Sequence, residues 1–193
     1  MIKPVTGRKL LKREERMASI LAAAARAFAT GGYAATSMDD IAAEAGITRL
    51  IIYRHFNSKQ ELYSAVLDST RDRLAEAVRY TGGAPESNMV QPLVTAARAE
   101  PEAFTLLFRH SAREPQFAEY AAEFTEASTA VAERALESVV GDPALRHWTA
   151  RMLFKTSIEG ILTALEFDDP ISDRELAERL LRISGAIVGA VTG

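Results

Sequence analysis

Apolar residues recur every three or four positions along most of this chain, and runs of alternating apolar and polar residues are missing. This spacing places apolar side chains on one face of an α-helix, and the abundant Ala, Leu, Glu and Arg favour helices. Glycine, proline and helix-capping residues divide the pattern into segments. We therefore expect an all-α fold of about nine helices, over residues 10–30, 38–45, 48–55, 59–80, 90–99, 101–112, 115–139, 143–166 and 172–190.

The signals that start and stop helices are dense in the first third of the chain. Gly31-Gly32 should end the first helix, because glycine readily takes the left-handed conformation found there. Ser37 precedes Asp40, and Ser58 precedes Glu61, at the spacing of a capping box. Gly46 then separates two short helices, which predicts a helix-turn-helix at about residues 38–55.

The stretch TGGAPESN, residues 81–88, holds two glycines and a proline and is typical of a linker. Together with the helix-turn-helix, it favours a chain in two parts. We place an N-terminal domain at residues 1–57 and a larger C-terminal domain at residues 58–193.

Charge is distributed unevenly between these parts. Residues 1–60 hold ten Lys and Arg against five Asp and Glu, a balance of +5, and the rest of the chain balances at −8. A basic N-terminal part indicates a polyanionic partner, although a chance fluctuation would give the same pattern.

Several classes of site and location are disfavoured by composition. The chain has no cysteine, and its three histidines are far apart, so we expect no disulfide, no metal and no cofactor. No apolar run approaches the ~20 residues of a membrane span, and the N-terminus lacks a signal-peptide core. We expect a cytoplasmic protein with no membrane partner.

The helix-turn-helix divides into apolar residues that hold it together and polar residues that face outward. The second helix of such a motif lies in the major groove of DNA. Phosphates accept from Lys, Arg, Tyr and Thr, and base edges contact Arg and apolar atoms. Of the bulky run Leu50-Ile51-Ile52, part should anchor the helix and Leu50 should face the bases. The expected inner residues are Ile41, Ala42, Ala45, Ile47, Ile52 and Phe56, and the expected outer ones are Thr48, Arg49, Tyr53, His55 and Lys59.

Residues 20–67 hold a specific combination of residues: Phe28, Gly32-Tyr33, Thr36, Ile41-Ala42, Ala45-Gly46, Ile47-Thr48, Tyr53, Phe56, Lys59 and Leu62. This combination resembles the TetR (tetracycline-repressor) family of bacterial transcriptional regulators. One departure concerns Leu50 and Ile51, whose positions are often small residues in that family.

The resemblance implies roles for individual residues in DNA binding. Thr36 and Lys59 would contact phosphates from the starts of their helices. Tyr53 and His55 would contact phosphates from the recognition helix, with a helix-dipole role as the alternative for His55. Bases would meet Thr48, Arg49 and Leu50. A basic arm of Arg8, Lys9 and Lys12 would enter a minor groove, unless it is simply solvated.

The resemblance also implies an effector pocket and a dimer interface in the C-terminal domain, with ordinary core packing as the alternative for each residue. The predicted pocket residues are Phe104, Phe108, His110, Phe117, Tyr120, Phe124 and Met152, and Met89 and Leu93 are further candidates. The predicted interface residues are Trp148, Met152, Ile161, Leu165, Leu180, Ile183 and Ile187.

These observations predict a regulator that binds a palindromic double-stranded DNA operator as a homodimer and is released by a small apolar or amphipathic effector, acting as a repressor. A helical DNA-binding regulator without a small-molecule effector is the first alternative. A helical enzyme or carrier is the second, but the chain shows no nucleophile elbow, phosphate-binding glycine loop or paired catalytic carboxylates, so we expect no enzyme.

Overall fold

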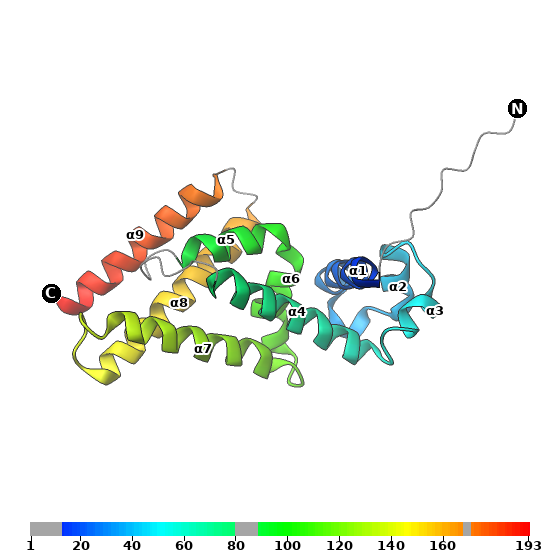
Figure 1. The fold of residues 1–193 in the computed structure, drawn as a ribbon, viewed down its shortest axis with the longest axis horizontal. Helices are drawn as coiled ribbons and strands as arrows, with labels where there is room; N and C mark the ends of the chain where they lie inside the picture. Colours follow the sequence, from blue (N-terminus) through cyan, green and yellow to red (C-terminus); the bar gives the residue numbers. More distant parts are fainter. Residues whose placement is uncertain (1–12, 80–88, 168–170) are drawn as a thin grey trace, which may run out of the picture. The chain divides into compact units, whose positions relative to one another are not determined.

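The computed structural model describes residues 13–79, 89–167 and 171–193, and within these ranges it contains nine α-helices and no strand (Figure 1). The all-α prediction is confirmed. The predicted basic arm and the predicted linker lie outside the described residues. Contacts between Cα atoms divide the chain into one unit that ends at Ala65 and a second that begins at Val66. This division falls eight residues after the boundary that we predicted, inside the fourth helix.

The first unit contains helix α1 (Arg13–Ala35), α2 (Met38–Glu44), α3 (Arg49–Tyr53) and the start of α4 (Lys59–Arg79). Gly32 interrupts α1 with a φ of 75°, in the left-handed region where glycine is unstrained, and a last turn follows it. The predicted Ser37–Asp40 capping box is present in full. At the start of α4, Ser58 caps the amide of Glu61, but the Glu61 carboxylate accepts from the Asn57 amide instead of the Ser58 amide.

An aromatic cluster forms the centre of this unit. Phe28 and Tyr63 are fully buried, and their ring centroids lie 4.8 Å apart in an edge-to-face arrangement. Tyr33 packs on Tyr63 in the same manner at 5.1 Å. Ile41 of α2 and Ile52 of α3 are also fully buried, so both short helices are anchored to this core.

The second unit contains the rest of α4, followed by α5 (Val90–Ala99), α6 (Pro101–Thr105), α7 (Ala118–Leu136), α8 (Pro143–Glu166) and α9 (Asp173–Thr192). Asp142 and Ser172 cap α8 and α9 through backbone amides three residues later. In Figure 1 the two long helices α7 and α8 run through this unit, with α9 at its C-terminal edge. Gly160 of α8 allows close packing against Leu180 of α9, because a Cβ there would lie 2.4 Å from a Leu180 methyl carbon.

One predicted helix is divided in the structure. Residues 101–112 were predicted as a single α-helix, but α6 passes into a π-helical turn at Leu106–His110 and a 3₁₀ turn at Ser111–Arg113. The buried Ser111 hydroxyl donates to the carbonyl oxygen of Leu107 at 2.5 Å. This side-chain bond supplies a buried carbonyl of the irregular stretch with a partner.

No helix among the described residues is both long enough and apolar enough to span a bilayer.

Candidate functional site

The turn between α2 and α3 is set by local chemistry. The Ser37 amide and hydroxyl both donate to the Asp40 carboxylate, and these bonds lower the pKa of Asp40. Gly46 takes a φ of 62°, which a residue with a side chain adopts only with strain. The Ile47 amide then donates to the Ala42 carbonyl oxygen at 3.0 Å, which closes the turn. The two helices are therefore held at a fixed angle by residues that the sequence identified.

Helix α3 sorts its bulky apolar residues as expected from the sequence. Ile52 is fully buried, Ile51 is half-buried, and the side chain of Leu50 is exposed to 65%. Among the other predicted inner residues, Ile41, Ala42 and Phe56 are buried, and Ala45 and Ile47 are half-buried. An exposed leucine beside a basic side chain offers both an apolar surface for a thymine methyl and donors for a guanine.

Arg49 is the centre of a small polar cluster on the outer face of α3. Its Nη1 donates to the Asp39 carboxylate at 2.7 Å, and its Nη2 donates to the Tyr53 hydroxyl at 3.0 Å. The guanidinium also lies 5.2 Å from the centroid of the Tyr53 ring. The bond to Tyr53 and then the charge of Asp39 raise the pKa of Arg49. Arg49 is thus a fixed cation on the face that also presents Leu50.

Thr36 has a different role from the one predicted. Its side chain is almost wholly buried, and its hydroxyl donates to the carbonyl oxygens of Gly32 at 2.7 Å and Ala27 at 3.2 Å. In this position the hydroxyl provides a hydrogen-bond donor to carbonyl oxygens near the end of α1. It is not directed outward toward a phosphate. The prediction of a phosphate contact is therefore corrected for this side chain.

Lys59 also serves the end of α1. Its Nζ donates to the carbonyl oxygens of Tyr33, Ala34 and Thr36 at 2.7, 3.1 and 2.9 Å, which uses all three ammonium hydrogens. The same Nζ lies 4.6 Å from the centroid of the Tyr33 ring. A lysine at the C-terminus of a helix compensates the negative end of the dipole. This arrangement leaves no ammonium hydrogen for the phosphate contact that we predicted.

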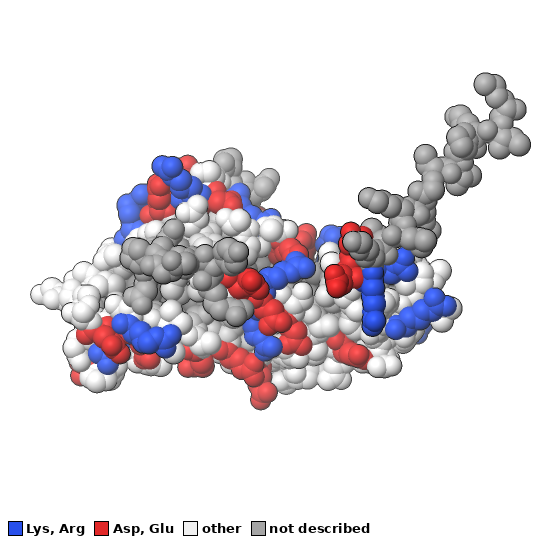
Figure 2. Space-filling model, in the orientation of Figure 1, with Lys and Arg blue, Asp and Glu red and all other residues white. Residues whose placement is uncertain are grey.

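The remaining predicted DNA residues lie on the outer side of the unit. Thr48 is exposed at the N-cap of α3, where its side chain makes no capping bond. His55 is half-buried just after α3. Figure 2 shows basic atoms gathered on the visible face over α2 and α3. The structure thus brings Thr48, Arg49, Leu50 and Tyr53 together on one surface.

Most of the aromatic residues predicted to line a pocket in the second unit pack against one another, although Phe124 also lines a cavity. Phe104 and Phe117 are almost wholly buried. Phe108 contacts Phe104, Phe124 and Phe154, with centroid separations of 4.7, 5.7 and 6.3 Å. His110 is half-buried, and burial followed by the charges of Arg113 and Arg109 lowers its pKa.

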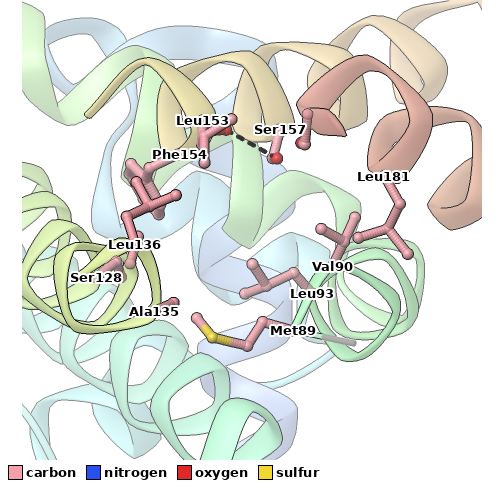
Figure 3. A pocket seen from close by; sticks show the side chains of 12 residues that line it. Met89, Val90, Leu93, Ser128, Ala135, Leu136, Leu153, Phe154, Ser157 and Leu181 are labelled. Carbon is pink, nitrogen blue, oxygen red and sulfur yellow. Dashed lines mark hydrogen bonds between the residues drawn. The ribbon is translucent and has the colours of Figure 1, made fainter. Parts of the chain in front are cut away.

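Two apolar cavities lie elsewhere in this unit. The first, of about 370 Å³, is bounded by side chains from α5, α7, α8 and α9 (Figure 3). The second, of about 490 Å³, lies along α4 and α7. Met89 and Ser128 line both, and Leu93 lines the first, whereas Phe124 is the only one of the seven predicted pocket residues that lines either. The first cavity is lined by Met89, Val90, Leu93, Ser128, Ala132, Ala135, Leu136, Leu153, Phe154, Ser157, Leu181 and Ser184, and the second by Arg71, Asp72, Ala75, Val78, Met89, Glu123, Phe124, Ala127, Ser128 and Val131.

Part of the predicted dimer surface is exposed and part is internal. Trp148 is exposed to 52%, and Met152 and Ile183 are also exposed. Leu165 and Ile187 are half-buried. Ile161 and Leu180 are buried within the unit, so their predicted place in an interface is corrected to core packing. Apart from the nearby backbone of α9 itself, no heavy atom of the described residues lies within 4 Å of a Cβ added at Gly185 or Gly189, so this side of α9 is open.

The comparisons with known proteins converge on one family. Residues 20–66 match the family described as bacterial regulatory proteins, tetR family. The chain is similar to the HTH-type transcriptional activator FasR of Mycolicibacterium smegmatis, with 33% identity over 180 residues, which cover 87% of this chain and 80% of FasR.

Solved structures share the fold. A TetR-like transcriptional regulator from Rhodococcus sp. RHA1 superposes with a TM-score of 0.76 and 22% identity, over 90% of this chain and 96% of that chain. The regulator FadR from Bacillus subtilis, solved in complex with stearoyl-CoA, gives a TM-score of 0.61 and 16% identity, over 91% and 97%. The chain therefore belongs to the TetR family, and it is a DNA-binding transcriptional regulator with a helix-turn-helix, not an enzyme.

Proposed function

We propose that the protein is a homodimeric, ligand-responsive repressor that binds a palindromic operator and releases it when an apolar or amphipathic molecule enters the second unit. The observation that carries this proposal is the pairing of an exposed Leu50–Arg49 surface in the first unit with apolar cavities in the second.

The proposed DNA contacts come from the surface of α3. Arg49 and Leu50 are placed to meet base edges, with Thr48 beside them at the start of the helix. The Tyr53 hydroxyl accepts a bond from Arg49 and keeps its own hydrogen for a phosphate. His55 is a further phosphate ligand, at the C-terminal side of α3.

The proposed dimer forms through α8 and α9. Trp148, Met152 and Ile183 expose large apolar surfaces, and Gly185 and Gly189 leave room for a close approach. A two-fold interface built from two helices of each subunit gives a four-helix arrangement. Two copies of α3 are needed to reach half-sites one helical turn apart on the duplex.

The proposed effector occupies the cavities of the second unit. Their lining is mostly Ala, Leu, Val, Met and Phe. The polar groups are Ser128, Ser157 and Ser184 in the first cavity, and Arg71, Asp72, Glu123 and Ser128 in the second. A mostly apolar cavity with few polar groups is typical of a small-molecule site. The FadR structure with stearoyl-CoA shows that this fold accommodates an amphipathic acyl compound in another member, which supports the same class of ligand here.

The link between the two units is α4, which begins at Lys59 in the first and continues into the lining of the second cavity at Arg71. A ligand changes DNA affinity only by the difference between its affinities for the two states of the protein. We propose that the two states differ in the position of α4. A regulator without an effector remains the alternative, because cavities of this kind also occur as incomplete packing.

The test uses the full chain. Duplexes that it retains from a random-sequence library define the operator, light scattering gives the mass of the free and bound protein, and long-chain acyl-CoA is the first effector probe. We expect a dimer, an enriched palindrome, and release of the duplex by the probe. A cavity-filling Ser128→Leu variant should bind the operator with unchanged affinity but resist release.

The control is Thr125→Val, on the same helix but outside both linings, which should respond like the wild type. A monomer that enriches no sequence contradicts the regulator as proposed. A dimer that enriches a palindrome but that neither acyl-CoA nor a wider set of apolar compounds releases favours the alternative without an effector.

A further inference from the structure

We propose that Asp39 is a positioning residue for base recognition, which holds the Arg49 guanidinium together with Tyr53 in an orientation that leaves it able to contact a guanine. This inference rests on the proposed role of α3 in reading DNA. It assigns specificity to an acidic side chain on a surface that faces a polyanion.

Each of the three acidic residues of α2 has a different partner. Asp40 accepts from the amide and the hydroxyl of Ser37, the N-cap residue, and completes the capping box of α2. Glu44 pairs with Arg26 of α1 at 2.6 Å. Asp39 alone of the three reaches past the turn into α3, where it accepts from Arg49 at 2.7 Å. The first two pairs hold the unit together, whereas the third fixes a side chain on the outer surface.

The number of donors on Arg49 makes this arrangement compatible with base contact. A guanidinium has five N–H groups, and the bonds to Asp39 and Tyr53 use one on Nη1 and one on Nη2. Three N–H groups remain, and a guanine needs two, for its O6 and N7 atoms. Arg49 is thus able to keep both intramolecular partners while it contacts a base.

A held arginine discriminates better than a free one. Ordering a long flexible side chain at an interface opposes binding, and a side chain already ordered in the free protein avoids part of that loss. The Asp39 and Arg49 side chains are exposed to 64% and 52%, so the pair contributes little to folding stability in water. Against a duplex, where water is excluded, the same pair is stronger.

The charge of Asp39 has a second and separable effect. A carboxylate near phosphates weakens binding to every sequence alike, because it opposes the counterion-release contribution of the basic residues. Removing it should therefore strengthen binding to random duplex while it weakens the preference for one base pair. Opposite changes in these two quantities distinguish positioning from a simple change in net charge.

The experiment compares four full-length proteins: wild type, Asp39→Asn, Arg49→Ala and the control Glu44→Gln, which removes the same charge from the same helix. Each is titrated by fluorescence anisotropy, at one salt concentration, with the duplex selected by the wild type, with all its single-base-pair variants and with a random pool. Melting temperatures establish that the variants are folded.

We expect Arg49→Ala to lose a guanine preference at one position of each half-site. In Asp39→Asn that same preference should fall by a factor of about three to ten, and the affinity for the random pool should rise. Glu44→Gln should keep the preference within about twofold of the wild type.

An Asp39→Asn preference equal to that of the wild type overturns the inference. So does a loss spread evenly over all positions, or a loss matched by Glu44→Gln. If Arg49→Ala leaves every preference unchanged, Asp39 has nothing to position and the inference is also wrong. A wild type that selects no sequence at all instead contradicts the proposed function, so the two failures are distinct.

Discussion

Side-chain hydrogen bonds are used differently in the two units. In the first, side chains reach backbone groups far along the chain, as Lys59 does to the end of α1. In the second, several serine and threonine hydroxyls bond the carbonyl oxygen four residues earlier in their own helix, as in Thr70, Thr125 and Ser157. Lys59 thus ties α4 to the end of α1 in the first unit. The hydroxyls of the second unit are satisfied within single helices, beside bonds between elements such as that from Arg98 to the Ile171 carbonyl oxygen.

This difference fits the roles proposed for the two units. A surface that reads DNA needs side chains in fixed positions, and bonds between elements supply that. A unit that admits a ligand needs helices that shift without leaving buried polar atoms unpaired, and bonds within single helices permit such shifts. In the ion pairs between helices of the second unit, such as Arg71–Glu123 and Arg109–Glu159, the carboxylates are exposed and the arginines are half-buried, so solvent screens these pairs in part.

The strongest test of the ties in the first unit is Lys59→Met, which leaves three carbonyl oxygens without their charged donor. We expect a loss of about 2–3 kcal/mol in the stability of this unit, because bonds to charged groups are strong and the acceptors lose their partner. Hydrogen exchange at the end of α1 measures it directly. The matched variant Arg54→Met, also a lost cation but an exposed one, should change stability by less than about 0.5 kcal/mol. Equal losses of stability in the two variants would show that the Lys59 hydrogen bonds do not stabilise this unit.

Packing in the second unit is tested by Gly160→Val, which places carbon atoms against the buried Leu180. We expect a loss of about 1–3 kcal/mol, since added methyl groups in a packed contact force neighbours to move. Urea unfolding followed by the fluorescence of Trp148 on α8 reports on this unit. Combining the change with Leu180→Ala should recover part of the loss. Strict additivity of the two would contradict the contact.

The smallest expected effect concerns His110. Its lowered pKa means that the folded state disfavours the protonated ring, so the unfolded state binds more protons once the pH falls below the ordinary value of 6.5. Stability should therefore be constant above that value and fall as the pH drops from it toward the lowered pKa of the folded state. His110→Asn should reduce this fall in thermal melts between pH 7.5 and 5.5. A variant with the same pH profile as the wild type would assign the fall to other groups.

The sequence predicted most of the fold because its signals are local. Capping boxes, helix-ending glycines and Pro143 after Asp142 each act within one turn of a helix, and the bounds of α5 and α8 were predicted to the residue. The π-helical turn at Leu106–His110 was missed because it depends on tertiary packing around a buried stretch. The outward position of Leu50 was predicted because an apolar side chain among basic neighbours suggested a surface that contacts bases.

The roles of Thr36 and Lys59 could not be predicted from neighbouring residues in the sequence, because the fold brings their hydrogen-bond acceptors to them. Lys59 lies 23 or more residues from the carbonyls that it binds. The cavity residues were missed for a different reason. Attention to aromatic residues leads to the core, which large rings fill, whereas the first cavity is lined in part by small side chains such as Ala132, Ala135 and Ser157. Alanine and serine residues on the long helices α7 and α8 were the signal available.

The position of Met89 has a consequence for what the second unit can hold. Met89 lines both cavities, and its unbranched thioether side chain changes conformation at low energetic cost. If the proposed effector displaced this side chain in one cavity, the space left in the other would change. Under that proposal, the two cavities either bind bulky ligands one at a time or together hold one elongated ligand.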